Sequence, residues 1–457
     1  MSTTTEHEPL TAWQGEDVTV GDVLDALHGI RAKFARTDVG DDEHGHPRNC
    51  VMTLIGIAPT ESDERVARHT TQLISSEHPA QAIVIREEAP LRGHHLDAWI
   101  TTEAQQPGAG CPTECEIITL HVRGAAAEHL AALVDPLLVS GVPTYLWWLG
   151  TPPFGKKELA DALRVCDGLV VDSARFNEPF NSFRGLSRLL KAAHHRLGLA
   201  DLQWSRLRPW REMIAQFFTP VDRRHFLTGI AEVGVDYAGD GRGNRIAAAL
   251  ITGWMAGALG WRLRSAAAGQ GGVVVAHYLA SGRSVEVDFR SVQREHLTPG
   301  ELGAVRIAGA SRGTTFRLSV QHDPERRPPP ADTVYQAMHP TEGEDDAGFE
   351  LAQRRAEWHR DVLHENLGSL HHTATGDAPG ESRPRPPIVL SRDRRRPDTE
   401  RVLLTLIEIG EGRPLRHVQQ LDRQDEVALL LDLLSTGTHD EVFNRSLAAA
   451  SALIDKF

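Results

Sequence analysis

Apolar and polar residues follow one another along the first 220 residues in patterns that predict strands alternating with helices. Val18–Arg31 carries apolar residues at helical spacing, which is typical of an amphipathic helix. Ser62–Ser76 shows the same spacing, with Ser62 as the expected N-cap. Runs rich in β-branched residues predict strands at Asn49–Ile57, Ala82–Arg86, Ala98–Thr102, Glu116–Val122, Pro143–Leu149 and Leu169–Asp172. Further helices are expected at Ala125–Leu138, Lys156–Leu163, Gly185–Leu197 and Pro209–Phe218.

The pattern changes after about Pro220. The segment Asn244–Trp261 is predicted to form a long buried helix. Strands separated by short glycine-containing turns are expected at Gly272–Leu279, Ser284–Phe289, Ala304–Ile307 and Thr315–Val320. Near the C-terminus we expect a strand at Val402–Ile409 and helices at Glu426–Leu434 and Glu441–Leu453.

These elements predict an α/β protein. Its N-terminal sheet is mixed and largely parallel with helices on both faces, and a C-terminal α+β domain has an antiparallel sheet. The expected organisation is an N-terminal helical arm (1–35), an α/β domain (36–220), the first part of the α+β domain (221–321), a Pro- and charge-rich insertion or linker (322–400), and a C-terminal strand and helices completing the second domain (401–457). Phe349–Leu367 is a candidate helix within the insertion.

Charge and composition narrow the class of protein. Lysine plus arginine total 49 and aspartate plus glutamate total 62, so the formal net charge is −13. A nucleic-acid binder needs a basic face, so we expect none here. The N-terminal residues lack the pattern of a signal peptide, and the most apolar window, Ala247–Leu263, is too short and mixed to span a bilayer. We therefore expect a cytoplasmic protein without membrane contact.

Two glycine-containing segments approach catalytic motifs without meeting their requirements. Gly150–Lys157 (GTPPFGKK) nearly fits a P-loop, but Lys157 replaces the magnesium-binding hydroxyl, and Pro152 and Pro153 lack the N–H groups that cradle a phosphate. Gly309–Gly313 (GASRG) fits the nucleophile-elbow pattern, but a strand rather than a helix follows Ser311, so we expect a hairpin turn. We expect no catalytic residues.

Other candidate sites are weaker. The segment Gly239–Gly243 (GDGRG) precedes a helix and offers N–H groups to an anion, with a plain loop as the alternative. His44, His46 and Cys50 lie in a different loop from Cys111 and Cys115, so their spacing is not that of a structural zinc site. We expect neither a metal nor a cofactor, and we keep a redox role for Cys111 and Cys115 as a candidate beside two ordinary thiols.

Aromatic and arginine side chains supply candidates for protein binding. Trp147 and Trp148 are neighbours on a strand, so they point to opposite faces of it. The stretch from Trp204 to Phe218 combines tryptophan with arginine, the residues that most often anchor interfaces. Core packing with outward-reaching arginines is the equally weighted alternative. The predicted partner-binding residues are Trp147, Trp148, Trp204, Arg206, Trp210 and Arg211.

The same segments resemble a known family when they are read in order. The matching residues are Arg48–Val51 with Thr53–Leu54, His78–Pro79 with Ala82–Ile85, Cys115–Leu120, Val142–Pro143 with Leu146–Trp148, Asp172–Ser173 with Phe176, Trp204–Phe218 with its core Arg206–Arg211, and Asp440–Phe443. This pattern resembles the OpcA family, the bacterial glucose-6-phosphate dehydrogenase assembly proteins. The resemblance covers the first half of the chain and its C-terminal end, and it does not extend to the segment after His322.

The resemblance implies a non-catalytic assembly factor or allosteric activator. Such a protein binds glucose-6-phosphate dehydrogenase, favours its active oligomer, and so supports the oxidative pentose phosphate pathway and NADPH supply. The alternative is an enzyme or sensor that binds a sugar phosphate or nucleotide at the strand ends of the α/β domain, near Gly150 and Asp172.

Overall fold

The computed structural model describes residues 10–37, 50–88, 94–105, 113–124, 129–193, 196–239, 244–268, 273–293, 297–322, 401–421 and 426–456. The chain divides into two compact units, residues 1–318 with 424–457 and residues 319–423. The domain boundaries expected from the sequence stay a prediction. The expected helix at Phe349–Leu367 and nearly all of the expected insertion lie outside the described residues.

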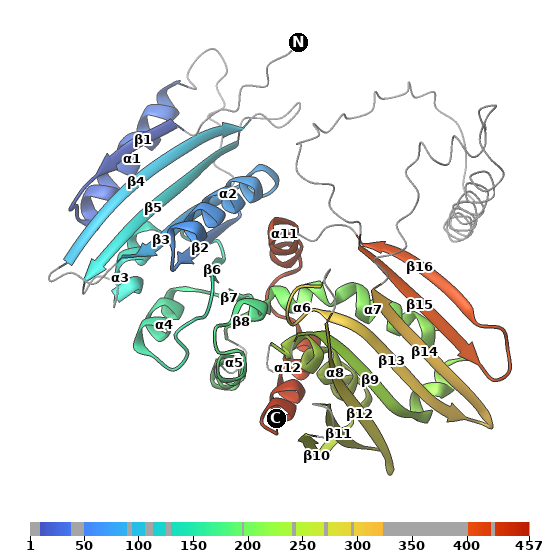
Figure 1. Ribbon diagram of the computed structural model, residues 1–457. Coiled ribbons are helices and arrows are strands. Elements are labelled where there is room, and N and C mark those ends of the chain that lie inside the picture. Colours follow the sequence, from blue (N-terminus) through green and yellow to red (C-terminus); the bar gives the residue numbers. More distant parts are fainter. Residues whose placement is uncertain are drawn as a thin grey trace, which may run out of the picture. The chain divides into compact units, whose positions relative to one another are not determined.

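The first unit begins with a sheet in the order β1-β4-β5-β3-β2-β6-β7-β8 (Figure 1). The strands from β5 to β8 in this order are all parallel, whereas β4 runs antiparallel to β5 and β1 antiparallel to β4. The strands are β1 (Leu10–Gly15), β2 (Met52–Ala58), β3 (Ala80–Glu87), β4 (His94–Gln105), β5 (Thr113–Gly124), β6 (Thr144–Trp148), β7 (Gly168–Val171) and β8 (Gly198–Asp201). The largely parallel sheet expected from the sequence is confirmed.

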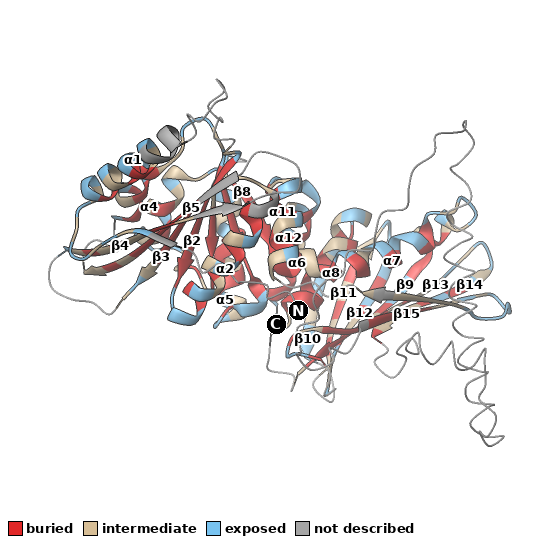
Figure 2. Ribbon diagram, turned by 90° about the horizontal axis from the view of Figure 1, so that it is seen from above, coloured by how far each residue is buried: buried red, intermediate tan, exposed pale blue. Residues whose placement is uncertain are grey.

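Helices cover both faces of this sheet, as expected (Figure 2). They include α1 (Val20–Thr37), α2 (Glu61–Glu77), α3 (Leu130–Val134), α4 (Lys157–Ala162) and α5 (Pro179–Ala193). The short α6 (Leu202–Arg206) follows β8, whereas Phe217 and Phe218 of α7 (Arg208–Phe218) pack on Phe316, outside this sheet. On one face, buried residues of α2 share a core with Trp147 and with Leu429, Leu430, Leu433 and Leu434 of the C-terminal helix α11 (Glu426–Thr436). The chain therefore returns from its far end to complete the N-terminal core.

A second sheet follows in the order β10-β11-β12-β9-β13-β14. Its strands are β9 (Ile230–Ala238), β10 (Arg262–Ala268), β11 (Val274–Ala280), β12 (Arg283–Val292), β13 (Leu302–Ser311) and β14 (Thr314–His322). The expected antiparallel α+β region is confirmed, with one exception, because β12 runs parallel to β9. The buried helix α8 (Ile246–Leu259) packs on β9 and, more extensively, on α12 (Glu441–Ile454). In the second unit, β15 (Arg401–Ile409) pairs antiparallel with β16 (Leu415–Leu421).

Several details differ from the sequence-based expectation. Thr60, not Ser62, caps α2, because its hydroxyl accepts from the N–H of Asp63. The helix expected at Ala125–Leu138 ends earlier than predicted, because a 3₁₀ turn over Asp135–Leu137, which contains Pro136, directly follows α3. Residues 125–128 lie outside the described residues. Strands β1, β8, β9, β10 and β16 were not predicted; β8 is only four residues long, and β10 reads as polar and alanine-rich.

Both near-miss motifs are turns. Gly150 and Gly155 have φ angles of +83° and +79°, and within the loop the N–H of Phe154 donates to Pro152 and that of Lys156 to Pro153. Those two N–H groups are therefore bonded within the loop and are not available to a phosphate. Ser311 ends β13, and the hairpin turn follows at Arg312 and Gly313, whose φ angles of +53° and +80° are left-handed. Among the described residues no helix is long and apolar enough to cross a bilayer.

Candidate functional site

The strand order β5-β3-β2-β6-β7-β8 is that of the dinucleotide-binding (Rossmann) fold. In such sheets ligands bind beyond the carboxyl ends of the strands, where the order reverses; here that point lies between β2 and β6. This carboxyl edge is the first place to look for a site. The residues at this edge decide whether a dinucleotide can bind there.

The turn between β2 and α2 does not suit a pyrophosphate. It reads Ala58-Pro59-Thr60-Glu61, with no glycine to let the backbone approach a phosphate, and Pro59 has no N–H. Glu61, Asp63 and Glu64 occupy the first turn of α2. Carboxylates at the helix N-terminus repel the anion that this fold otherwise binds there, so a dinucleotide does not fit.

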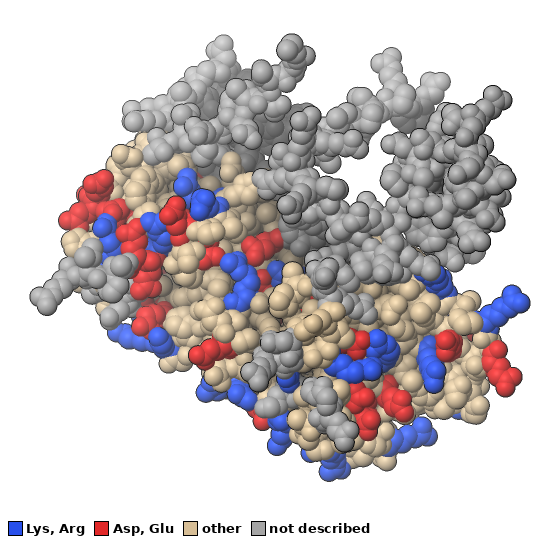
Figure 3. Space-filling view, viewed as in Figure 1, with Lys and Arg blue, Asp and Glu red and all other residues tan. Residues whose placement is uncertain are grey.

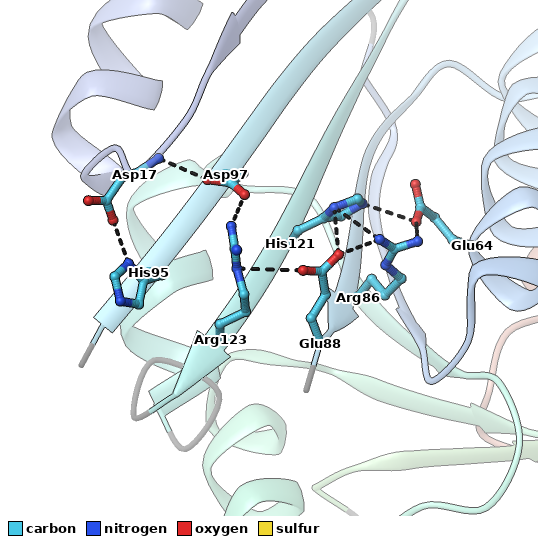
Figure 4. Close-up of polar contacts among 8 residues, drawn as sticks. All are labelled: Asp17, Glu64, Arg86, Glu88, His95, Asp97, His121 and Arg123. Carbon is cyan, nitrogen blue, oxygen red and sulfur yellow. Dashed lines mark hydrogen bonds and ion pairs between the residues drawn. The ribbon is translucent and has the colours of Figure 1, made fainter. Parts of the chain in front are cut away.

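Next to this turn lies a network of ion pairs at the ends of β3 and β5 (Figure 4). Glu64 of α2 pairs with Arg86 at 3.0 Å and with Nε2 of His121 at 3.0 Å. Glu88, just after β3, pairs with Arg86 and lies 3.3 Å from Nδ1 of His121. In the dinucleotide fold a carboxylate near this position binds the ribose. Here it is bonded within the chain.

The network continues onto β4. Arg123 lies 3.5 Å from Glu88 and also pairs with Asp97, while the N–H of Asp17 donates to Asp97 at 2.8 Å. We call Glu64, Arg86, Glu88, Asp97, His121 and Arg123 the carboxyl-edge network. Acidic and basic side chains lie interleaved over this part of the surface (Figure 3).

Two carboxylates of this network, Glu64 and Glu88, have pKa values below the ordinary one. The hydrogen bond from Arg86 lowers the pKa of Glu88 against the smaller effect of its burial. For Glu64, burial by itself favours the neutral acid, but the hydrogen bond from His121 and the charge of Arg86 bring its pKa below the ordinary value. With Trp99 packed at 4.4 Å from the His121 ring, this part of the edge is closed by the chain's own groups.

A second cluster closes the ends of β7 and β8. Arg206 donates two hydrogen bonds to Asp172, at 2.7 and 2.8 Å. Asp201 is fully buried and accepts from the N–H of Ser173 at 2.9 Å, from its hydroxyl at 2.6 Å and from the N–H of Gln203 at 3.0 Å. Burial and the charge of Asp172 raise the pKa of Asp201 to about 6.

This cluster also connects distant elements. Arg175 donates to Asp63 of α2 at 2.7 Å and to Glu426 of α11 at 3.2 Å. The side-chain amide of Asn244, just before α8, donates to the carbonyl of Ser173 at 3.0 Å. The groups near Asp172 thus hold the first sheet, α8 and the C-terminal helices together, which is a structural use of the strand ends.

An open cleft lies on the other side of α6. It has a volume of about 650 Å³ and is lined by β8, α6, α7, α8, α11, α12 and the turn between the last two helices. Trp204 and Arg211 stand in its wall, with the guanidinium of Arg211 3.5 Å above the Trp204 ring. The Trp204 indole donates to Asp440 at 2.9 Å, across 236 residues of sequence. We call this the α6–α12 cleft.

The structure separates the six residues predicted to bind a partner. Trp147, Trp148, Trp204 and Trp210 are between 1% and 7% exposed, which favours core packing for these rings. Trp147 and Trp148 face opposite layers of the first sheet, and Arg206 is bound to Asp172. Of the six, only Trp204 and Arg211 meet in the α6–α12 cleft. The partner-binding role itself stays a prediction.

Most of the residues proposed for a redox or metal site cannot be compared with the structure. Cys111, His44, His46 and the side chain of Cys115 lie outside the described residues, as do residues 240–243 of the glycine-rich segment. Cys166 is described as a free thiol, and burial raises its pKa to about 12, so it is protonated at neutral pH. Within the described ranges no three His, Cys, Asp or Glu side chains are grouped as metal ligands.

Sequence reasoning missed the cleft because its walls come from distant segments. The turn Gly437–His439 reaches β8 through a bridge between His439 and Leu199. Asp440 accepts from the N–H groups of Val442 and Phe443 as the N-cap of α12. An aspartate directly before an apolar helix is a readable cap signal, but nothing near it in the sequence indicates that it also binds Trp204.

Comparison with known proteins places the chain in a family. Residues 71–188 match the family model described as the glucose-6-phosphate dehydrogenase subunit N-terminal domain, and residues 197–447 match that of the C-terminal domain. Two solved structures are similar at a low level: a provisionally named oxidoreductase of Parabacteroides merdae (TM-score 0.38, 10% identity, 90% of this chain and 98% of that one) and a dehydrogenase (MviM) of Clostridium difficile (TM-score 0.32, 8% identity, 59% and 78%).

Three cyanobacterial relatives carry the provisional name OxPP cycle protein OpcA. The protein of Nostoc punctiforme is 31% identical over 45% of this chain and 46% of its own, that of Synechococcus elongatus 28% over 52% and 55%, and that of Synechocystis 33% over 32% and 30%. The matched region thus spans about half or less of each of these relatives. Since the second family model alone covers more than half of the chain, this protein belongs to the OpcA family of glucose-6-phosphate dehydrogenase assembly proteins.

Proposed function

We propose that this protein binds glucose-6-phosphate dehydrogenase in the cytoplasm and favours its active oligomer without catalysing a reaction itself. The observation that carries the proposal is the match of most of the chain to the two domains of a family named for that dehydrogenase. The proposed role supports the oxidative pentose phosphate pathway and its supply of NADPH. A net charge of −13 agrees with a protein partner rather than a nucleic acid.

The carboxyl edge of the first sheet supports the non-catalytic part of the proposal. A dehydrogenase of this fold needs a phosphate-binding turn and a free carboxylate for the ribose. In this chain an acidic turn without glycine stands in place of the phosphate-binding turn. The carboxylate nearest the ribose position, Glu88, is not free, because it is bonded to Arg86. The first sheet thus has the strand order of a dinucleotide-binding fold, but its carboxyl edge lacks the groups that bind the dinucleotide.

The mechanism proposed is a shift in population. A partner that binds the active oligomer more tightly than the inactive form raises the active fraction by the ratio of its two affinities. No chemistry in the partner protein is required, so an activator without catalytic residues is sufficient.

A mixed assay tests the proposal. Dehydrogenase from the same cell is assayed with increasing amounts of the full chain, and the oligomer is sized by analytical ultracentrifugation. We expect activity and oligomer size to rise together and then saturate, while the chain alone oxidises nothing. An unrelated protein of similar acidity is the control. If the two proteins do not co-sediment and the kinetics stay unchanged, the proposal is wrong.

A further inference from the structure

The α6–α12 cleft has the size of a small-molecule site. Its volume of about 650 Å³ lies within the range of roughly 300–1,000 Å³ that is usual for ligand pockets. It opens beside the carboxyl end of β8 and does not include the carboxyl-edge network. Its charged groups indicate which ligand chemistry it suits.

Most carboxylates of the cleft are already bonded. Glu212 and Asp432 share Arg208, at 2.9 and 3.0 Å. Asp440 accepts from the Trp204 indole and from two N–H groups of α12, and Asp201 is bonded to Ser173 below the cleft floor. Glu441, exposed at the rim, is the remaining acidic side chain among the described lining residues.

Two arginines of the cleft, by contrast, have no carboxylate within 4.0 Å in the part of the chain that is described. Arg211 is largely buried: it packs over Trp204 and donates from Nη2 to the Trp204 carbonyl at 3.3 Å. Its Nε is buried without a hydrogen-bond acceptor among the described atoms. Burial lowers the pKa of Arg211 to about 10, so the guanidinium is still charged at neutral pH.

The second arginine is Arg445 on α12. It is exposed, and its Nε donates to the carbonyl of Glu441 at 3.4 Å, which leaves the rest of its fork open. The cleft also has apolar side chains in its lining. Trp254 is half-buried there, and 38% of Val442 is exposed. A planar guanidinium fork recognises phosphate and carboxylate groups in bidentate fashion.

We propose that the α6–α12 cleft binds a small anionic metabolite, with its phosphate or carboxylate group held by Arg211 and Arg445 and its carbon skeleton against Trp254 and Val442. An anion there gives the buried Arg211 guanidinium a directly bonded charge partner, which the more distant charges of Asp440 and Glu212 do not provide. The inference goes beyond the proposed assembly role, because it concerns the chain alone. It does not depend on whether the dehydrogenase binds.

Calorimetric titration of the full chain tests the site in a buffer without multivalent anions. Glucose 6-phosphate is the phosphate probe, with glucose as its uncharged match, and citrate is the carboxylate probe. We expect saturable binding of at least one anion, with a Kd below about 1 mM, and no binding of glucose. The two anionic arms distinguish a phosphate from a carboxylate ligand.

Variants then locate the binding. Arg445→Gln weakens binding about tenfold, because a charge-assisted hydrogen bond is lost. Arg188→Gln is the matched control, since Arg188 is also an exposed helix arginine whose Nε donates 3.4 Å to the carbonyl four residues earlier. Glu441→Gln removes the rim carboxylate and tightens binding about two- to threefold. Arg211→Gln abolishes binding, and its helix content is compared by circular dichroism because Arg211 also supports Trp204.

Two outcomes overturn the proposal. One is the absence of binding by either anion up to about 10 mM, well above the expected Kd. The other is binding that Arg445→Gln and Arg188→Gln leave equally strong, which places the anion elsewhere. Loss of dehydrogenase binding in Arg445→Gln without any small-anion binding also contradicts the proposal, and it identifies the cleft as a protein contact instead.

Discussion

At the scale of single residues, Asp201 is a carboxyl group whose surroundings change its pKa. Its carboxyl is completely buried at the end of β8, close to the charge of Asp172, and both effects raise its pKa to about 6. Hydrogen bonds from Ser173 and Gln203 oppose this rise without cancelling it. The folded protein therefore binds this proton more tightly than the unfolded chain, in which an aspartate has its ordinary pKa near 4.

The sign of the pH dependence follows. The contribution of Asp201 to stability is fully present below about pH 4 and is lost as the pH rises through about 6, by about 3 kcal/mol at most. Asp201→Asn keeps an acceptor for the two N–H groups and removes the titration. We expect urea unfolding at pH 4, 5, 6 and 7 to show the wild type losing stability relative to Asp201→Asn. A constant difference between the two proteins would contradict the prediction.

Arg206 is a structural residue by its contacts. Its two hydrogen bonds neutralise Asp172, whose side chain is 5% exposed. Arg206→Ala leaves that carboxylate buried and unpaired, so we expect a loss of about 3 kcal/mol in the free energy of unfolding. Arg208→Ala is the control: Arg208 pairs with Glu212 and Asp432 at the surface, and its loss costs under about 1 kcal/mol. Equal effects in chemical denaturation would show that the buried pair has no special weight.

At the scale of elements, the crossing of α8 and α12 joins the second sheet to the C-terminal end of the chain. Gly253 lies where the helices approach most closely: a Cβ there would come within 2.4 Å of the Ser446 carbonyl and 2.8 Å of the Ala450 nitrogen. Gly257, one turn later, would place its Cβ 3.6 Å from Arg445, an ordinary contact distance. The two glycines of one helix therefore have different roles.

This difference gives a matched pair of substitutions. Gly253→Ala forces the helices apart, and we expect it to cost about 2 kcal/mol. Gly257→Ala replaces a poor helix former without a clash and should stabilise the protein by up to about 1 kcal/mol. Thermal and denaturant unfolding measure both. Changes of the same sign would mean that α8 and α12 are not packed as closely as described.

At the scale of the whole molecule, the strand order of a dinucleotide-binding sheet is combined with an edge that rejects a dinucleotide. The acidic turn of α2 and the carboxyl-edge network occupy the positions of the pyrophosphate and the ribose. The fold by itself therefore does not indicate a function, which depends on the groups placed at the site.

This combination predicts that the chain does not bind NADPH at its first sheet. Titration of NADPH followed by its own fluorescence should show no saturable enhancement up to about 1 mM, whereas the dehydrogenase binds in the same assay. The acidic residues of the α2 turn offer a check, since Glu61→Gln with Glu64→Gln removes two of the repelling charges. Tight binding by the wild type would contradict both the closed-edge argument and the non-catalytic proposal.

The sequence alone determined most of the secondary structure of this protein and the family to which it belongs. Apolar spacing within a few residues predicted most helices and strands, because side-chain direction repeats with the local backbone. The defects of GTPPFGKK and GASRG were also local, and the turns are confirmed. The ordered match to the OpcA family is confirmed by both of its domains.

Only the tertiary structure decided where the functional candidates lie. The aromatic and arginine residues of Trp204–Phe218 are adjacent in sequence, yet Arg206 turns to Asp172 while Arg211 turns into the α6–α12 cleft. The partners that settle this lie far along the chain, 34 residues away for Arg206 and 236 residues away for Trp204. Burial and charge pairing depend on such distant neighbours, and a local pattern carries no information about them.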